Sequence, residues 1–200
     1  MRVENSFVPV RGVGEKTERR LWRDGVTDWG RFEEKGKDVL GGKRHDRVLG
    51  YIDSARNALD ADDADFFGET FPDSELWRMY RNFEDEACFF DIETTGLSPE
   101  QNVITTVSFH IGGETTTLVR GDDLTPGNVR EILNDANLVV SYNGKRFDAP
   151  FVETDLDVSV KTPHVDLMYP CRRVGLTGGL KTVEERLGVG RDEAVNDVDG

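Results

Sequence analysis

The stretch CFFDIETTGLSP at residues 88–99 constrains the fold more than any other part of the chain. The apolar run Cys88-Phe89-Phe90 is typical of a buried strand, yet it leads directly into Asp91 and Glu93. Alternate residues of a strand point to the same face, so both carboxylates are expected to project from one side of the strand's end. Left unpaired they would repel, and one would tend to stay protonated. Divalent ions such as Mg²⁺ or Mn²⁺ would relieve the repulsion; the alternative is an ordinary exposed strand end.

The pattern around this stretch predicts an α/β fold. Three strand-like runs occupy 87–93, 102–111 and 114–120, and a further buried strand is expected at 137–143. Helices are expected at 125–136, where Thr125 caps and Pro126 follows, from 145 onward, and at 178–189. Residues 164–171 read as extended. Strands first, then helices alternating with strands, indicate a layered fold with a mixed sheet.

Two motifs carry a family resemblance. FFDIETTGL (89–97) resembles the first motif of the DEDD 3′–5′ exonucleases, which have a ribonuclease H-like fold, and VVSYNGKRFDAPFV (139–152) resembles the second. Together with WRMYRNF (77–83) and LKTVEERLGVGR (180–191), they make the chain similar to the YprB-like group of predicted exonucleases. The resemblance implies a ribonuclease H-like mixed sheet flanked by helices, with a small helical N-terminal region.

The resemblance also implies a 3′–5′ exonuclease that hydrolyses DNA or RNA with two Mg²⁺ or Mn²⁺ ions roughly 4 Å apart. The implied catalytic and metal-binding residues are Asp91, as the bridging ligand, Glu93 and Asp148. Those implied to bind the substrate are Thr94, Thr95, Gly96, Leu97, Asn143 and Phe147. For Phe147, a place in the core is an equal alternative to stacking on a base.

The chain departs from the family pattern at the fourth acid. The third motif requires His or Tyr followed at a fixed distance by Asp, and neither His164 nor Tyr169 has an Asp at that distance. Asp166 lies before the position of that motif and is interpreted as structural or supporting. We therefore expect the exonuclease domain to lack its C-terminal part, or to be a shortened variant.

Residues 6–32 contain Gly12-Val13-Gly14 followed by a helical segment, Glu15 to Asp24. This resembles the second half of a helix-hairpin-helix motif, in which backbone N–H groups at a helix N-terminus approach a phosphate. The resemblance implies that Gly12, Gly14 and Lys16 contact a nucleic-acid backbone. A small helical cap with a glycine turn is the alternative.

Three segments follow from this reading: a helix-hairpin-helix-like segment at 1–36, a helical linker region at 37–85, and the exonuclease domain at 86–200. Within the linker region, 43–59 has the apolar spacing of an amphipathic helix. The acidic stretch 60–74 is interpreted as a solvated linker whose phenylalanines dock on a neighbour. Ser74 is expected to cap a helix that leads into the exonuclease domain.

The most informative feature of the composition is the excess of acidic residues. The net charge is −14, with 7 Lys against 18 Arg, as on acidic surfaces of proteins from salt-loving organisms. Residues 1–59 hold 13 basic and 10 acidic residues, and 60–200 hold 12 and 29. The mildly basic first segment is expected to contact something negatively charged. The expected partner is nucleic acid, DNA in preference to RNA. Two cysteines give no disulfide framework, and no apolar run is long enough to span a membrane, so a cytoplasmic location is expected.

Two functions remain open on the sequence. The first is a metal-dependent 3′–5′ exonuclease. The second is a nucleic-acid-binding module that keeps the fold without turnover, which the missing fourth acid favours and the intact Asp91, Glu93 and Asp148 oppose. An acidic adaptor that binds protein through its N-terminal segment would leave these carboxylates unexplained.

Overall fold

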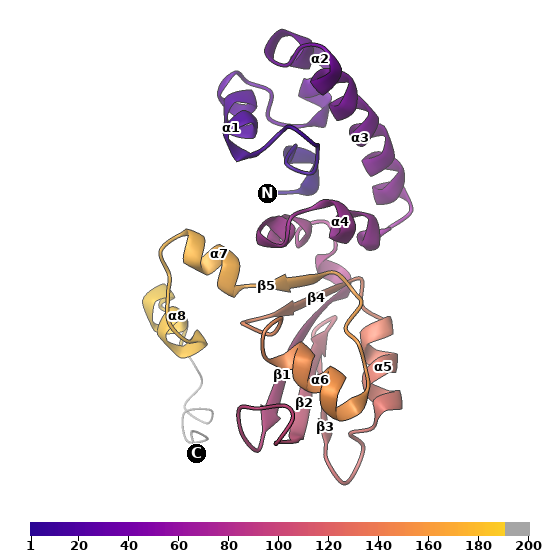
Figure 1. Ribbon diagram of the computed structural model, residues 1–200, viewed down its shortest axis with the longest axis vertical. Coiled ribbons are helices and arrows are strands. Elements are labelled where there is room, and N and C mark those ends of the chain that lie inside the picture. Colours follow the sequence, from indigo (N-terminus) through magenta and orange to yellow (C-terminus); the bar gives the residue numbers. More distant parts are fainter. Residues whose placement is uncertain (191–200) are drawn as a thin grey trace.

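The computed structural model of the chain describes residues 1–190 and shows a helical part above an α/β part (Figure 1). We call residues 1–86 the head. Its helices stand over one end of the sheet, and the chain then runs through the sheet to two further helices at its side. The helices of the head are α1 (Glu15–Arg23), α2 (Trp29–Val39), α3 (Lys43–Asp60) and α4 (Ala64–Thr70), with 3₁₀ helices at Val3–Asn5, Asp73–Met79 and Glu84–Glu86.

Side-chain caps define where several helices begin. Asp28 accepts the N–H of Arg31 at 2.9 Å at the start of α2, and Asp63 accepts that of Phe66 at 3.0 Å at the start of α4. Thr125 likewise accepts the N–H of Asn128 at 3.2 Å, which confirms the predicted cap of α5 (Pro126–Asn134). Each cap satisfies an N–H group that has no partner inside its helix.

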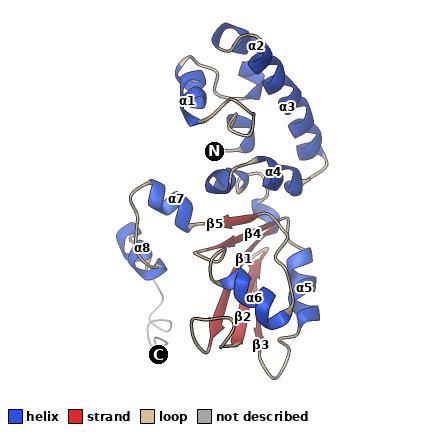
Figure 2. Ribbon diagram, in the orientation of Figure 1, coloured by secondary structure: helices blue, strands red, loops and turns tan. Residues whose placement is uncertain are grey.

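Within the described residues, five strands form one mixed sheet in the order β3-β2-β1-β4-β5 (Figure 2). The first three strands are antiparallel, while β4 and β5 run parallel to β1. The strands are β1 (Ala87–Thr94), β2 (Ile104–Ile111), β3 (Glu114–Val119), β4 (Leu138–Ser141) and β5 (His164–Asp166), and the remaining helices are α6 (Asp148–Leu156), α7 (Met168–Arg173) and α8 (Leu180–Leu187). The predicted α/β class, with a mixed sheet flanked by helices and a helical N-terminal region, is confirmed.

Two apolar clusters hold the fold together on opposite faces of the sheet. One face of β1, with Cys88, Phe90 and Ile92, packs under α5 and α6. On the other side, the cluster of the head runs from Val3 to Ala87 and includes Leu138, Val140 and Val165 of the sheet. The head and the sheet therefore share a core, and β4 is buried on both faces.

A buried ion cluster links the head to the segment after β5. Arg78, 2% exposed, pairs with Glu18 at 2.9 Å and with Glu75 at 2.6 Å. Arg173 of α7 bonds Glu75 and also pairs with Glu15 of α1 at 2.8 Å. Charges buried in this way are tolerated only when each has a partner. The cluster thus joins α1, the 3₁₀ helix Asp73–Met79 and α7.

Three sequence expectations are corrected. The stretch 60–74 is not a solvated linker, because α4 forms within it and buries Phe67 in the core of the head. Ser74 caps no helix; the segment is the 3₁₀ helix Asp73–Met79, which begins after Pro72. Residues 164–171 are extended only through β5 and then turn into α7.

The predicted division into three segments remains a proposal. Its first boundary, 36/37, falls inside α2, and the last ten residues of the predicted exonuclease domain lie outside the described residues. Cys88 and Cys171 are free thiols; Cys88 is buried and Cys171 is half-buried. Burial raises the pKa of Cys88 to about 12. None of the helices described in residues 1–190 has the length and apolar character needed to cross a bilayer.

Candidate active site

Strand β1 presents Asp91 and Glu93 on the face of the sheet opposite α5 and α6. Both residues are exposed, whereas their neighbours Phe90 and Ile92 are buried on the other face. This alternation is the one predicted from the i, i+2 spacing. The two carboxylates therefore share one side of the strand's end.

Asp148 reaches β1 from the first position of α6. It is 4% exposed, and its Oδ1 accepts the N–H of Ile92 at 3.2 Å. Strand β4 pairs with β1 only as far as Phe89 and Val140, so Asp148 satisfies an N–H that lies beyond that pairing. The first turn of the helix also favours a negative charge. The second motif is thus brought to the first, at the residue between Asp91 and Glu93.

The electrostatics of Asp148 are those of a crowded acid. Burial raises its pKa, the charge of Asp91 raises it further, and Asp166 adds a smaller effect, so that the pKa reaches about 7 despite the N–H bonds that oppose the shift. When two carboxylates repel each other at a partly desolvated site, either protonation of one of them or binding of a cation is favoured. The carboxylates of Asp91 and Asp148 thus lie close enough for their charges to interact.

The structure does not group all three predicted metal ligands together. In residues 1–190, no three His, Cys, Asp or Glu side chains are grouped closely enough to hold a metal ion. Glu93 shares the face of Asp91, but it is not gathered with Asp91 and Asp148. The donor set itself, made of hard carboxylate oxygens, is the type that Mg²⁺ and Mn²⁺ prefer.

The loop after β1 holds the predicted substrate residues. Thr94 donates its hydroxyl to the carbonyl of Gly96 at 2.6 Å, and the Thr95 hydroxyl accepts the N–H of Val103 at 3.1 Å. A side chain at Gly96 would clash with Asn102, because a Cβ there would lie 2.4 Å from its Oδ1. Leu97, at the outside of this loop, is 84% exposed. The loop is thus braced from within and presents one apolar side chain to solvent.

Asn143 and Phe147 take different positions in the turn between β4 and α6. Asn143 has a left-handed backbone with φ +66°, and its side chain is half-buried. Phe147 packs against the core under α6, with its ring centroid 5.0 Å from that of Phe151. Phe147 therefore takes the core position that was one of its two predicted alternatives.

The sequence did not reveal a groove of about 330 Å³ beside Asp91. Its floor is the open face of the sheet, where Phe89 is 39% exposed, and Leu180 of α8 forms part of its wall. Tyr142 also lines it and donates its hydroxyl to the carbonyl of Gly178 at 2.8 Å. Side chains alternate along β2, and this alternation places Ser108 and His110 on the face that carries the groove. The alternation is the one sequence signal that could have identified these two residues.

In the head, one of the three predicted backbone-binding residues, Lys16, lines a basic groove of about 560 Å³, whereas Gly12 and Gly14 do not line it. Gly12 has φ +91° and lies beside the side chain of Arg44, and Gly14 is the N-cap of α1. Only the short 3₁₀ helix Val3–Asn5 precedes this turn among the described residues, so a complete helix-hairpin-helix motif is not shown. The residues that line the groove are Glu15, Lys16, Thr17, Arg19, Arg20, Arg23 and Arg44.

Comparison with known proteins identifies a family, and it finds solved structures that are similar to part of the chain. A family model described as "RNase_H superfamily" matches residues 88–200, and no curated protein matches the chain. The family B DNA polymerase from the archaeon Pyrobaculum calidifontis is 18% identical, with a TM-score of 0.44 over 52% of this chain and 18% of that one.

Two nuclease structures are similar over comparable lengths. A structure titled "apo form of the nuclease" is 25% identical, with a TM-score of 0.44 over 56% of this chain and 57% of that one. NrnC of Brucella melitensis with bound Mg²⁺ is 21% identical, with a TM-score of 0.43 over 57% and 59%. The chain thus spans less than 60% of the length of each of the three structures. Assignment of a ribonuclease H-like fold rests on the family match together with the strand order.

Proposed function

Because the chain belongs to the RNase_H superfamily, we propose that it is a metal-dependent nuclease that hydrolyses the phosphodiester bonds of DNA or RNA in the 3′–5′ direction. The observation that carries this proposal is the position of Asp148. This carboxylate is buried against β1 beside Asp91, and its pKa is raised to about 7. A cation would relieve the repulsion between the two acids.

The proposed metal ligands are Asp91, Glu93 and Asp148, which would hold Mg²⁺ or Mn²⁺. When bound, the ions supply an activated hydroxide and charge stabilisation at the leaving 3′ oxygen. Asp148 stays fixed by its bond to the Ile92 N–H. Glu93 is exposed on the same face as Asp91 and would complete the donor set.

The loop after β1 is proposed to hold the 3′-terminal nucleotide. Leu97 is 84% exposed, and contact with a base or sugar would remove it from water. The Thr94–Gly96 bond and the packing of Gly96 on Asn102 keep the loop close to β1. Thr95 and Asn143 are proposed to contact the backbone of this nucleotide.

The basic groove of the head is proposed to bind the phosphate backbone away from the cleavage site. It offers Lys16 together with four arginines in a protein whose net charge is −14. Contacts of this kind position a nucleic acid without reading its sequence. DNA is favoured over RNA in this proposal, and a cytoplasmic location goes with it.

The direct test is a degradation assay on single-stranded DNA and RNA with Mn²⁺ at high salt. With a 5′ label, cleavage from the 3′ end gives a ladder of shortening products, whereas a 3′ label is released at once as a mononucleotide. Asp91→Asn should lower the rate by at least about 100-fold, because losing even a supporting contact of a metal ligand costs ~10–100-fold. Binding of the oligonucleotide should persist.

The matched control is Glu114→Gln, which removes an exposed acid from the edge strand β3. It should leave the rate unchanged. Full Mn²⁺-dependent activity in Asp91→Asn, from a preparation in which the control behaves normally, would show that Asp91 holds no metal.

The second candidate is a nucleic-acid-binding module without turnover. It is favoured by the finding that no three acidic, His or Cys side chains are gathered in residues 1–190. The same assay separates the two candidates: oligonucleotide binding with no product at any Mn²⁺ concentration would select the binding module.

A further inference from the structure

The turn from β4 to α6, residues 141–148, carries Asn143 and Asp148 and therefore sets the geometry of the proposed site. Three polar side chains that have no part in the proposed chemistry are buried at its start or beneath it. Ser141 is 6% exposed, His164 is 7% exposed and Asp166 is 2% exposed. Polar groups buried this deeply are costly unless each is hydrogen-bonded.

Asp166 holds the turn through its backbone. One carboxylate oxygen accepts the N–H of Asn143 at 2.8 Å and that of Met168 at 3.0 Å, and the other accepts the N–H of Lys145 at 3.3 Å. Asp166 pairs with Ser141 across β4 and β5, so the sheet itself places the carboxylate under the turn. A carboxylate with three N–H donors is a strong anchor. It supports the left-handed backbone of Asn143.

Ser141 and His164 hold the middle of the same turn. The Ser141 hydroxyl lies 2.7 Å from Nε2 of His164 and accepts the N–H of Gly144 at 3.2 Å. Burial lowers the pKa of His164 to about 4, so the ring is neutral near pH 7 and Nε2 can accept the hydroxyl proton. Gly144 is confined between the two elements: a Cβ there would lie 2.3 Å from the Ser141 oxygen and 3.2 Å from Oδ2 of Asp148.

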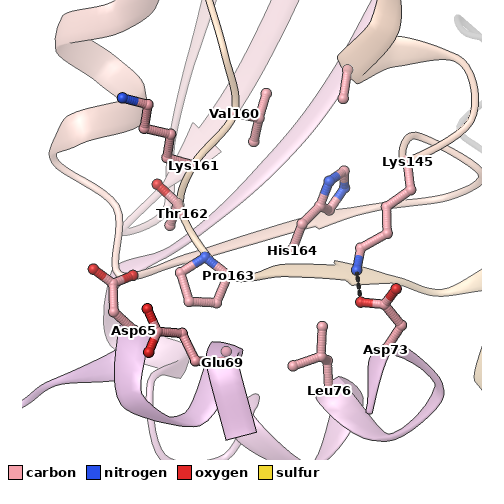
Figure 3. Close-up of a pocket in the computed structure, with 12 residues that line it drawn as sticks. Asp65, Glu69, Asp73, Leu76, Lys145, Val160, Lys161, Thr162, Pro163 and His164 are labelled. Atoms are coloured by element: carbon pink, nitrogen blue, oxygen red, sulfur yellow. Dashed lines mark hydrogen bonds and ion pairs between the residues drawn. The ribbon is translucent and has the colours of Figure 1, made fainter. Parts of the chain in front are cut away.

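The far side of the turn is tied to the head. Lys145 and Asp73 both line a pocket of about 580 Å³, and the Nζ of Lys145 lies 2.6 Å from the Asp73 carboxylate. Figure 3 shows this contact at one side of the pocket. His164 lines the same pocket. Backbone, hydroxyl and ammonium contacts therefore fix the turn at three successive positions before Asp148.

We propose that Ser141, His164 and Asp166 are positioning residues, which hold the turn 141–148 so that Asp148 faces Asp91 in a geometry able to bind a divalent ion. This inference rests on the proposed function. It assigns Asp166 a role distinct from that of a metal ligand, since its two oxygens are occupied by backbone N–H groups.

The test compares Asp166→Asn and Ser141→Ala with the unsubstituted 200-residue chain. Mn²⁺ affinity is measured by the paramagnetic resonance signal of free Mn²⁺, and the amide hydrogen exchange of Asn143, Gly144 and Lys145 is measured without metal. An Asn at 166 brings an NH₂ group toward N–H donors and cannot accept all three. We expect ~10–100-fold weaker Mn²⁺ binding, as for other residues that orient metal ligands, and faster exchange at these amides.

Glu18→Gln is the matched control, because Glu18 is also a buried carboxylate that accepts a backbone N–H, that of Phe7 at 2.7 Å, but lies in the head. It should leave Mn²⁺ affinity unchanged. Unchanged affinity and exchange in Asp166→Asn, in a protein that does bind Mn²⁺ and cleave, would overturn the positioning role alone. An unsubstituted chain that neither binds Mn²⁺ nor cleaves would overturn the proposed function, and the positioning role with it.

Discussion

At the scale of single residues, Asp148 is the residue where stability and proposed function oppose each other. Its pKa is about 7 in the folded chain, against ~3.9 for an unperturbed Asp. Between these values the folded chain holds a proton that the unfolded chain has lost. The free energy of unfolding therefore falls as pH rises from about 4 to about 7, and the loss remains above pH 7.

Asp148→Asn should reverse this loss in the absence of metal. Asn keeps the oxygen that accepts the Ile92 N–H but cannot ionise. The variant should gain stability over the unsubstituted chain as pH rises through this window, by at most on the order of 4 kcal/mol. Urea unfolding in EDTA at several pH values between 4 and 8 measures the difference. His164, whose pKa is lowered to about 4, titrates alike in both proteins and cancels.

Added Mn²⁺ should stabilise the unsubstituted chain and not Asp148→Asn, because only the folded state of the former would bind the ion tightly. A stability difference that is the same at pH 4.5 and pH 8 would contradict the crowded-acid description of Asp148.

A substitution at Leu97 should affect substrate binding without affecting stability. The side chain is 84% exposed, so Leu97→Ala should change the free energy of unfolding by less than about 0.5 kcal/mol. If it contacts the 3′-terminal nucleotide, the loss of its apolar area should raise KM for an oligonucleotide by roughly tenfold. Val174→Ala, at a residue that is 72% exposed on the segment after α7, is the control. Equal kinetics in the two variants would remove Leu97 from the site.

At the scale of elements, strong local signals were predicted correctly. Thr125 and Pro126 begin α5, and Gly188, with φ +69°, ends α8. The alternation in β1 correctly placed Asp91 and Glu93 on one face. In each case the sequence signal lies within a few residues of the feature that it predicts.

The elements that were missed depend on distant contacts. Helix α4 lies in an acidic stretch with a glycine, and what favours it is the burial of Phe67 among aromatic rings of the head. At the site, the bonds of Asp166 depend on the register between β4 and β5, which no local pattern specifies. The same holds for Ser141 and His164, which are 23 residues apart in the chain.

The ion cluster around Arg78 should contribute strongly to stability. Arg78→Ala leaves Glu18 buried without its ion-pair partner and leaves Glu75 paired with Arg173 alone, and removing one partner of a buried pair costs about 3–5 kcal/mol. Arg81→Ala, which removes an exposed pair with Glu84, should cost no more than about 1 kcal/mol. Urea unfolding of both variants checks this, and similar values for the two would show that the cluster is not a stabilising link.

At the scale of the whole molecule, charge is divided between two regions. Residues 1–59 are net +3, whereas 60–200 are net −17. A nucleic acid is therefore attracted to the head and repelled by much of the rest, and the proposed metal ions would be needed to admit a phosphate near Asp91.

Charge reversal in the head groove should weaken binding of long DNA and spare cleavage of short oligonucleotides. Lys16→Glu combined with Arg44→Glu changes both sides of the groove. We expect a lower affinity and a shallower dependence on salt, since fewer phosphates are neutralised. Lys37→Glu, an exposed site on α2 outside the groove, is the control for net charge. Equal effects per reversed charge at Lys37 and in the groove would assign the attraction to overall charge.

The core that the head shares with the sheet determines how a chain of this kind can be recombined. A crossover at residue 86 would part the head from Leu138, Val140 and Val165, which belong to its apolar cluster. The head and the sheet would then each expose the apolar surface that they cover in each other in the intact chain. An exchange of heads between related chains would therefore have to carry matching residues of β4 and β5.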